Sequence, residues 1–335
     1  MNEALNKKKF KLPISGNALV LIIALILITV VFSSINSNYF SYTNLMNILV
    51  SSTNIGLTSI GITFLIMTGG NDLSAGSVAA FAGVFVAWGL KATDISWPVL
   101  CLIALAIAAI AGIANALMVT KLNIVPFIAT LVSQSIWRGF AYLLCDGKPI
   151  SIADKGFKAL GTARIGGSYG VPVAVVLMFV CFIIFGYILA KTRFGRCIFA
   201  IGGNAEAARL AGINATRIKT ICYIMTSMFA ALAGIILAAR MNSGQPAASP
   251  NLHFDAITAA NLGGVSMVGG VGSIPSVVLG VLLVQAFNSG LNMINVSSYW
   301  QYVARGILLF GSLAIDFYRQ RSRAKRLLAD SMKSL

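Results

Sequence analysis

The chain has 335 residues, of which 58% are hydrophobic and only 10% are charged, and its formal net charge is +16. Soluble domains carry about 25% charged residues, so this composition excludes an ordinary soluble protein. Repeated apolar runs, close to the roughly 20 residues that cross a hydrocarbon core, indicate one polytopic membrane domain over residues 1–335.

Ten segments are predicted to be transmembrane helices, and the predicted fold class is therefore all-α. In chain order these segments cover residues 18–35, 45–68, 74–91, 98–120, 124–145, 171–190, 218–240, 256–268, 275–294 and 299–318. The first apolar run is not followed by a small-residue cleavage pattern. We therefore interpret it as a retained span rather than a signal peptide.

Basic residues predict the orientation of these spans, because cytoplasmic loops retain Lys and Arg. Three clusters dominate, and they lie in the N-terminal segment 1–17, the loop 191–217 with its flank, and the tail 319–335. Six spans before the loop and four after it place all three segments on the cytoplasmic side. We therefore expect a multi-pass protein of the bacterial cytoplasmic membrane with both termini inside.

One loop weakens this orientation. Residues 146–170 are predicted to lie outside, although the loop holds Lys148, Lys155, Lys158 and Arg164. The two larger clusters outweigh it. Membrane insertion and anionic lipid headgroups also account for the positive net charge, so no nucleic-acid partner is expected.

The sequence has no pattern typical of a catalytic, nucleotide-binding or metal-binding site. The five cysteines occur singly, without CxxC spacing, and there is one histidine. No GxxxxGK[ST] loop, HExxH motif or Ser/His/Asp set is present. We therefore expect no metal, no cofactor and no enzymatic activity in this chain.

Polar residues within or beside the predicted spans are candidates for a translocation path, since a hydroxyl-rich solute needs hydrogen-bonding partners rather than charges. A buried charge costs about 2.5 to 3.5 kcal/mol on the insertion scale, so Arg138 and Arg305 either snorkel to the headgroups or form a polar lining or an ion pair. Asp72 has the alternative role of capping the following helix. The path candidates are Asn54, Asn71, Asp72, Ser74, Arg138, Asn261, Asn288 and Asn292.

Two glycine-rich segments, 69–77 and 263–273, interrupt the apolar pattern. Irregular backbone at membrane depth is tolerated where protein or a water-filled cavity satisfies it, so such breaks often line a path. Tight helix packing and simple turns are the alternatives. The predicted topology places both breaks near the cytoplasmic face, which favours turns or a gate.

The polar segment 196–214 is unusual in a chain with only 9 acidic residues. It is short, helix-favouring and flanked by basic residues, which indicates a docking element on the cytoplasmic side. Gly202, Gly203 and Gly212 are expected to let the chain turn into and out of a short helix. Glu206 lies in its first turn, where the helix dipole favours negative charge, and capping of its own helix is the alternative role.

Motifs along nearly the whole chain resemble those of the permease subunits of bacterial ABC importers of the ribose, galactose and autoinducer-2 type. They are TGGNDLSAGS (68–77), FIATLVSQSIWRGFAYLLCDGKPI (127–150), TRFGRCIFAIGGNAEAARLAGIN (192–214), DAITAANLGG (255–264), VGGVGSI (268–274) and NSGLNMINVSSYWQ (288–301). The sequence departs from the expected pattern at Asn71, in place of Ile, and at Asn261, in place of a small aliphatic residue.

The resemblance implies the ribose-transporter type of permease fold. It implies a homodimer or heterodimer of permease subunits around one path, a pair of ABC ATPases that hydrolyse ATP, and an extracytoplasmic binding protein that delivers a monosaccharide or similar small polyol. Segment 206–212 then resembles the helix that couples permease to ATPase. The coupling candidates are Gly202, Gly203, Asn204, Glu206, Ala207, Ala208, Arg209 and Gly212.

Two other functional classes stay open at this point. An ion-gradient-driven secondary transporter of a small polar solute would need buried carboxylates for coupling, and Asp72 is the central candidate. A channel or scaffold is the third interpretation, and it would give passive flux or none. The sequence alone does not name the sugar.

Overall fold

The computed structural model describes residues 16–167 and 169–333, with side chains described as far as residue 322. Residues 1–15 of the predicted N-terminal segment lie outside the described residues, as do the last two residues of the tail. The remaining basic tail side chains, from residue 323 onward, are likewise not described.

Long helices dominate the described part of the chain. They are α1 (Gly16–Ile35), α2 (Tyr42–Met67), α3 (Ala75–Ala92), α4 (Trp97–Thr120), α5 (Pro126–Leu143), α7 (Val173–Lys191), α10 (Ala215–Met241), α12 (Ile274–Met293) and α13 (Ser298–Lys333). Shorter elements are η1 (Ser37–Phe40), α6 (Lys155–Thr162), α8 (Arg193–Gly203), α9 (Ala205–Leu210) and α11 (Leu252–Leu262), with strands β1 (Ile150–Ser151), β2 (Arg164–Ile165), β3 (Val171–Pro172) and β4 (Ser243–Gly244). The helical fold class predicted from composition is confirmed.

Seven of these helices, among the described residues, are long and apolar enough to cross a membrane: α1, α2, α3, α4, α7, α10 and α12. Helices α2, α3, α10 and α12 are largely buried inside the protein, whereas α1 and α7 are mostly exposed. Since α1 and α7 expose apolar side chains, lipid is the medium that suits those faces. The protein is therefore a multi-pass membrane protein with a buried inner group of helices.

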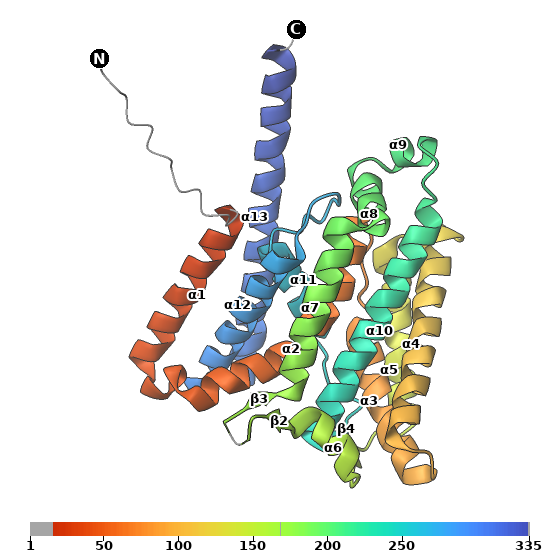
Figure 1. The fold of residues 1–335 in the computed structure, drawn as a ribbon, viewed down its shortest axis with the longest axis vertical. Coiled ribbons are helices and arrows are strands. Elements are labelled where there is room, and N and C mark those ends of the chain that lie inside the picture. The colour runs from red at the N-terminus through yellow and green to blue at the C-terminus, as the bar shows by residue number, and fades with distance from the viewer. Residues whose placement is uncertain (1–15, 168, 334–335) are drawn as a thin grey trace.

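The helices run between two ends of the molecule (Figure 1). Helices α8 and α9 lie at one end, here called the α9 end, where α1 begins and α13 finishes. Helix α6 and the short strands lie at the opposite end, here called the α6 end. The loop 146–170 and the polar segment 196–214 therefore lie at opposite ends, as the predicted topology requires.

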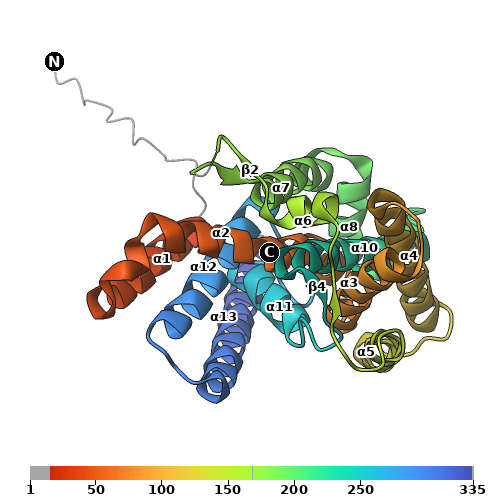
Figure 2. The ribbon, with the colours of Figure 1, turned by 90° about the horizontal axis from the view of Figure 1, so that it is seen from below.

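Helix α10 is the centre of the packing, because it contacts α2, α3 and α4. Figure 2 shows it inside the group, with α1 and α5 at the margins. Small residues allow these close contacts: a Cβ atom at Gly234 of α10 would lie 1.9 Å from the carbonyl oxygen of Ala79 on α3. Helix pairs in membranes commonly approach through such small residues, so the inner group is a rigid frame.

Two predicted helices differ from the observed ones. The predicted helix 256–268 is shorter and earlier, because α11 covers Leu252–Leu262 and the glycine-rich residues after it form a loop. The predicted end at 318 is wrong, since α13 continues to Lys333. Its polar tail is rich in Arg, Lys, Leu and Ala, which are all good helix formers.

The segment between α10 and α11 does not form a helix. Asn242 adopts φ of +52°, β4 pairs with β1 in an antiparallel two-residue sheet, and residues 245–251 lead back into the protein. Helix α11 then runs toward the α9 end and packs against α2, α12 and α13. Between α10 and α11 the backbone is therefore irregular. Contacts with the rest of the protein satisfy its polar groups.

Candidate functional site

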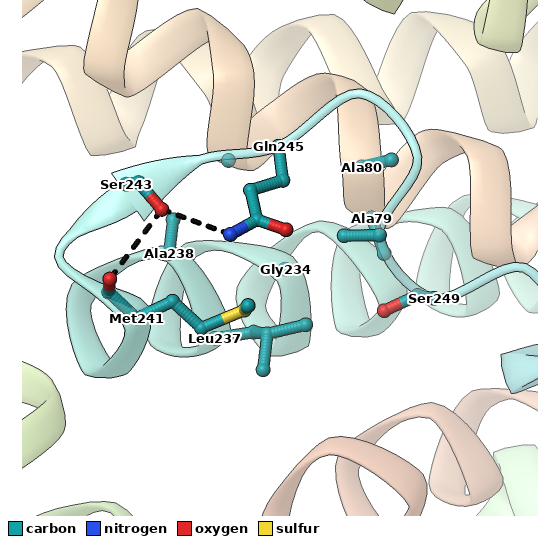
Figure 3. A pocket seen from close by; sticks show the side chains of 11 residues that line it. Ala79, Ala80, Gly234, Leu237, Ala238, Met241, Ser243, Gln245 and Ser249 are labelled. Carbon is teal, nitrogen blue, oxygen red and sulfur yellow. Dashed lines mark hydrogen bonds between the residues drawn. The ribbon is translucent and has the colours of Figure 1, made fainter. Parts of the chain in front are cut away.

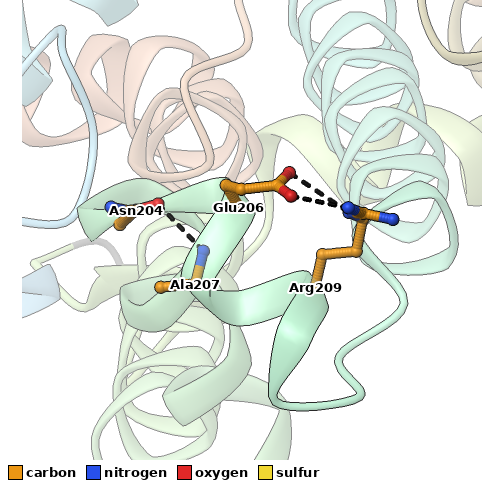
Figure 4. Close-up of polar contacts among 4 residues, drawn as sticks. All are labelled: Asn204, Glu206, Ala207 and Arg209. Carbon is orange, nitrogen blue, oxygen red and sulfur yellow. Dashed lines mark hydrogen bonds and ion pairs between the residues drawn. The ribbon is translucent and has the colours of Figure 1, made fainter.

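The first part of the site is the short helix α9 with its caps (Figure 4). Asn204 ends α8 and begins α9, and its Oδ1 accepts a hydrogen bond of 2.9 Å from the Ala207 N–H. Gly212 has φ of +80°, a left-handed conformation that suits glycine after a helix. The predicted turn at Gly212 and the predicted short helix are therefore confirmed.

Glu206 does not cap this helix, because Asn204 occupies the cap. The Glu206 carboxylate pairs with Arg209 instead, at 2.6 Å to Nη2 and 3.1 Å to Nε. Both side chains are exposed, at 65% and 69%, and Leu210 beside them is 78% exposed. The Glu206 carboxylate raises the pKa of Arg209. Helix α9 therefore presents a charged pair and a large apolar side chain at the end of the molecule.

The predicted turn at Gly202 and Gly203 is wrong, because both residues lie within α8. Gly202 serves close packing: a Cβ atom there would lie 1.9 Å from the Met67 carbonyl oxygen and 2.1 Å from the Gly270 nitrogen. The Gly270 N–H in turn donates to the Met67 carbonyl at 3.0 Å. Helix α8 is thereby joined to the end of α2 and to the loop 263–273, which brings both glycine-rich breaks to the α9 end.

The second part of the site is a polar cavity of about 260 Å³ between α2, α10, α11, α12 and α13. Its polar lining consists of Ser51, Asn54, Arg240, Ser249, Asn251, Asp255, Gln285, Asn288, Asn292 and Arg305. Three predicted path residues, Asn54, Asn288 and Asn292, therefore lie together, although they come from two helices far apart in the sequence.

Several polar atoms in this cavity have no hydrogen-bond partner within the described residues. They are Asn54 Oδ1, Asn288 Oδ1 and Arg305 Nε. Arg305 Nη1 lies 3.8 Å from Asp255 Oδ2, which is an ion pair but is too long for a hydrogen bond. Buried polar groups are normally satisfied, so these atoms are polar groups beside the cavity that this conformation leaves unpaired.

Arg138 does not line this cavity, but it binds the backbone of a segment that forms one of the cavity walls. Its Nη1 donates to the carbonyls of Pro246 at 2.6 Å and Ala248 at 2.9 Å. Both carbonyls belong to the irregular segment 245–251, which contributes Ser249 and Asn251 to the cavity lining. Of the three alternatives for Arg138, which were snorkelling, a polar lining and an ion pair, none describes this contact, because the guanidinium binds protein backbone.

The other face of that segment closes a small cavity of about 10 Å³, roughly one water, against α3 and α10 (Figure 3). Gln245 Nε2 donates to Ser243 Oγ at 3.1 Å, and Ala79 and Ala80 of α3 line the same space. The space is too small for a sugar. It marks tight packing of the segment against the rigid frame.

Asp72 and Ser74 form a separate buried cluster between α2 and α3, and Asn71 beside them is half-buried. Asp72 Oδ1 accepts from the Ser74 hydroxyl at 2.6 Å and from its N–H at 2.8 Å, and Asn115 of α4 donates to Ser74 Oγ at 3.0 Å. The predicted capping role of Asp72 is wrong, because α3 begins at Ala75 after the N-cap Ser74 and no described side chain accepts from its first N–H groups. This cluster stabilises the glycine-rich segment 69–77 and does not line the cavity.

Asn261 on α11 is also outside the cavity. It is 1% exposed, and neither of its side-chain polar atoms has a hydrogen-bond partner within the described residues. We find no structural reason for an amide at this position.

Sequence reasoning missed several residues of the cavity, namely Ser51, Arg240, Ser249, Asn251, Asp255 and Gln285, and it left Arg305 undecided. The sequence carried a signal for two of these residues, Asp255 and Arg305. Asp255 is a carboxylate in an apolar segment, and Arg305 was recognised as a costly charge with an ion pair among its alternatives. Their partnership needs α11 and α13 to be adjacent, which only the fold reveals.

Comparison with known proteins shows the family of this chain. The family described as "Branched-chain amino acid transport system / permease component" matches residues 44–313. The L-arabinose transport system permease protein AraH of Escherichia coli is 38% identical over 85% of this chain and 86% of its own length. The ribose import permease protein RbsC of Bacillus subtilis is 38% identical over 88% and 91%. No solved structure matches the chain significantly.

A helical membrane protein with a polar cavity between its helices is the class that the fold and site define. The match over most of its length shows that the chain belongs to the family of transport-system permease components. It is a transmembrane permease subunit of an ABC-type importer and not an enzyme, because ATP hydrolysis in such importers belongs to separate ATPase subunits.

Proposed function

We propose that this subunit forms the translocation path for a neutral monosaccharide or a similar small polyol, and that the path runs through the cavity of about 260 Å³. The observation that carries the proposal is the convergence of polar side chains from three different helices on this cavity: Asn54 of α2, Asn288 of α12 and Arg305 of α13. The relatives named for L-arabinose and ribose support a sugar as cargo.

The chemistry of the lining suits hydroxyl groups. A hydroxyl both donates and accepts, so it pairs with amide oxygens, amide N–H groups, guanidinium and carboxylate alike. The cavity offers all four, from Asn54, Asn288, Arg305 and Asp255. An apolar solute would leave these groups unpaired, at a cost of about 1 to 3 kcal/mol for each buried group.

We further propose ten membrane crossings, with the α9 end in the cytoplasm. Helices α5, α11 and α13 join the seven helices that qualify by length and apolarity. Helix α5 exposes a long apolar face, α11 continues the irregular segment across the layer, and the first part of α13 is apolar. The exposed basic residues beside α9, such as Arg193, Arg196 and Arg217, support this orientation.

In this orientation, α9 is the element that docks to the ATPase, and the coupling candidates around Glu206 surround the contact. The sugar-binding protein would dock at the α6 end. A second permease subunit, identical or related, would complete the path. The exposed charges and the exposed Leu210 on a short, firmly capped helix support the docking role.

Substitution of the cavity amides tests the path. Asn54→Leu and Asn288→Leu keep approximate volume and remove the hydrogen-bonding atoms. In proteoliposomes with the ATPase and the binding protein, we expect each to lower sugar uptake at least tenfold. ATPase association should be unchanged, because both residues are far from α9. The matched control is Asn38→Leu, the same change at an exposed position in η1. Equal uptake by all three variants contradicts the proposed path.

A further inference from the structure

The loop 263–273 is fixed to two groups of helices at once. On one side it meets α8 and α2, through the contact at Gly202 and the hydrogen bond from the Gly270 N–H to Met67. Within the loop, the Ser266 N–H donates to the Val271 carbonyl at 3.0 Å, and the Gly269 N–H donates to the Ser266 carbonyl at 3.0 Å. The loop is therefore a compact hydrogen-bonded body rather than a slack connection.

On its other side the loop is held by α13. Asp316 Oδ2 accepts a hydrogen bond of 3.1 Å from the Met267 N–H and one of 2.7 Å from Gln320 Nε2. Gln320 Nε2 also lies 3.2 Å from Ser266 Oγ. Asp316 is 7% exposed, and a carboxylate in such a place is retained at a desolvation cost. One carboxylate oxygen of Asp316 thus binds both the loop and the Gln320 side chain of α13, so the loop is held against this helix.

Helices α11 and α13, which both meet the loop, carry the charged pair of the cavity, Asp255 and Arg305. Helix α11 runs directly into the loop, and the Val265 N–H closes its end by donating to the Ala260 carbonyl at 3.0 Å. Its first turn carries Asp255. Helix α13 carries Arg305, which is 11 residues before Asp316 and so about 16 Å away along the axis. Since helices transmit displacement along their length, a shift of the loop reaches Asp255 and Arg305 together.

We propose that Asp316 is a positioning residue for transport, which couples movement of α8 and α9 to the cavity by holding the loop 263–273 against α13. This inference rests on the proposed docking of α9 to the ATPase. A rearrangement of α9 moves α8, the contact at Gly202 moves the loop, and Asp316 makes α13 follow. The Asp255–Arg305 pair then opens or closes on the solute.

The test measures solute taken up per ATP hydrolysed, a ratio that overall stability does not set. It uses the complete complex in proteoliposomes, with L-arabinose and D-ribose as probes. Asp316→Ala removes the acceptor, and we expect normal assembly and basal ATP hydrolysis with at least fivefold less sugar per ATP. Asp316→Asn keeps an acceptor oxygen, so the ratio should stay within twofold of wild type. The neighbouring exposed control is Phe317→Ala.

Gln320→Met is a milder variant that keeps side-chain length and helix propensity, and we expect it to lower the ratio at least twofold. Two outcomes overturn the inference. One is an unchanged ratio in Asp316→Ala or in Gln320→Met. The other is failure of Asp316→Ala to assemble, because Asp316 would then serve the fold alone. Wild-type complex that takes up neither sugar with ATP contradicts the proposed function for these sugars instead, so the two failures are distinguishable.

Discussion

The Cα of Gly202 on α8 lies so close to the Met67 carbonyl at the end of α2 that a Cβ atom at residue 202 would stand 1.9 Å from that oxygen. A Cβ atom on the next residue, Gly203, would have no such neighbour within 4 Å. Two adjacent glycines in one helix thus have different roles. Gly202 allows the contact between α8 and the transmembrane helices, whereas Gly203 faces open space.

This difference gives a matched pair of substitutions. We expect Gly202→Ala to force α8 away from α2 and to cost about 1 to 3 kcal/mol of stability, as overpacking of a close contact does. ATP-coupled uptake should fall at least tenfold. Gly203→Ala should change both quantities little. Thermal unfolding in detergent and uptake in proteoliposomes check the pair, and equal behaviour of the two variants would refute the assigned contact.

Charge reversal on α9 tests the docking surface. We expect Glu206→Arg to abolish co-purification of the ATPase and ATP-coupled uptake, while the permease itself folds normally, because the residue is exposed. The double variant with Arg209→Glu restores an ion pair within α9 but leaves the surface charges exchanged. If Glu206 acts by contacting the ATPase, the double variant stays defective. Recovery of ATPase binding in the double variant would mean that the internal pair alone matters.

Arg138 is expected to act on stability and on the cavity wall together. Arg138→Gln removes the guanidinium that joins the Pro246 and Ala248 carbonyls. Loss of charge-assisted hydrogen bonds costs about 1.5 to 3 kcal/mol, so the midpoint of chemical unfolding should fall. Arg138→Lys retains the charge without the planar guanidinium and should recover only part of the loss. Unchanged stability in both variants would contradict the stabilising role of Arg138.

The Asp255–Arg305 pair should matter more for transport than for folding. The two charged atoms are 3.8 Å apart, too far for a hydrogen bond, so we expect a coupling energy of only about 1 kcal/mol in a double-mutant cycle of Asp255→Asn and Arg305→Gln. Uptake should nevertheless fall at least tenfold in each single variant. A coupling energy of several kcal/mol with normal uptake would identify the pair as purely structural.

Much of the fold follows from local sequence signals. The apolar runs predicted most helices within a few residues, because length and apolarity are local properties. Helix α9 was predicted from such signals, and Asn204 and Gly212 occupy its two ends as the chemistry of capping requires. The error at α11 has a physical cause: residues 263–268, predicted to be helical, form a glycine-rich loop in which Gly264 adopts φ of +87°.

The candidate site was only partly predictable for the same reason. Asn54, Asn288 and Asn292 were found because polar residues inside spans are conspicuous. Asp255 and Arg305 were not joined, since their contact depends on the packing of α11 against α13. Gly202 was assigned to a turn because sequence alone does not distinguish a glycine that permits a bend from one that permits close packing.

The most direct test of the central claim is whether sugar enters proteoliposomes only when the permease, the ATPase with hydrolysable ATP, and the binding protein are all present. We predict that uptake of the cargo sugar stops when any one of the three is omitted, and that it is insensitive to an ionophore. Uptake that persists without the ATPase and collapses when an ionophore dissipates the ion gradient would contradict the account, and it would identify a secondary transporter instead.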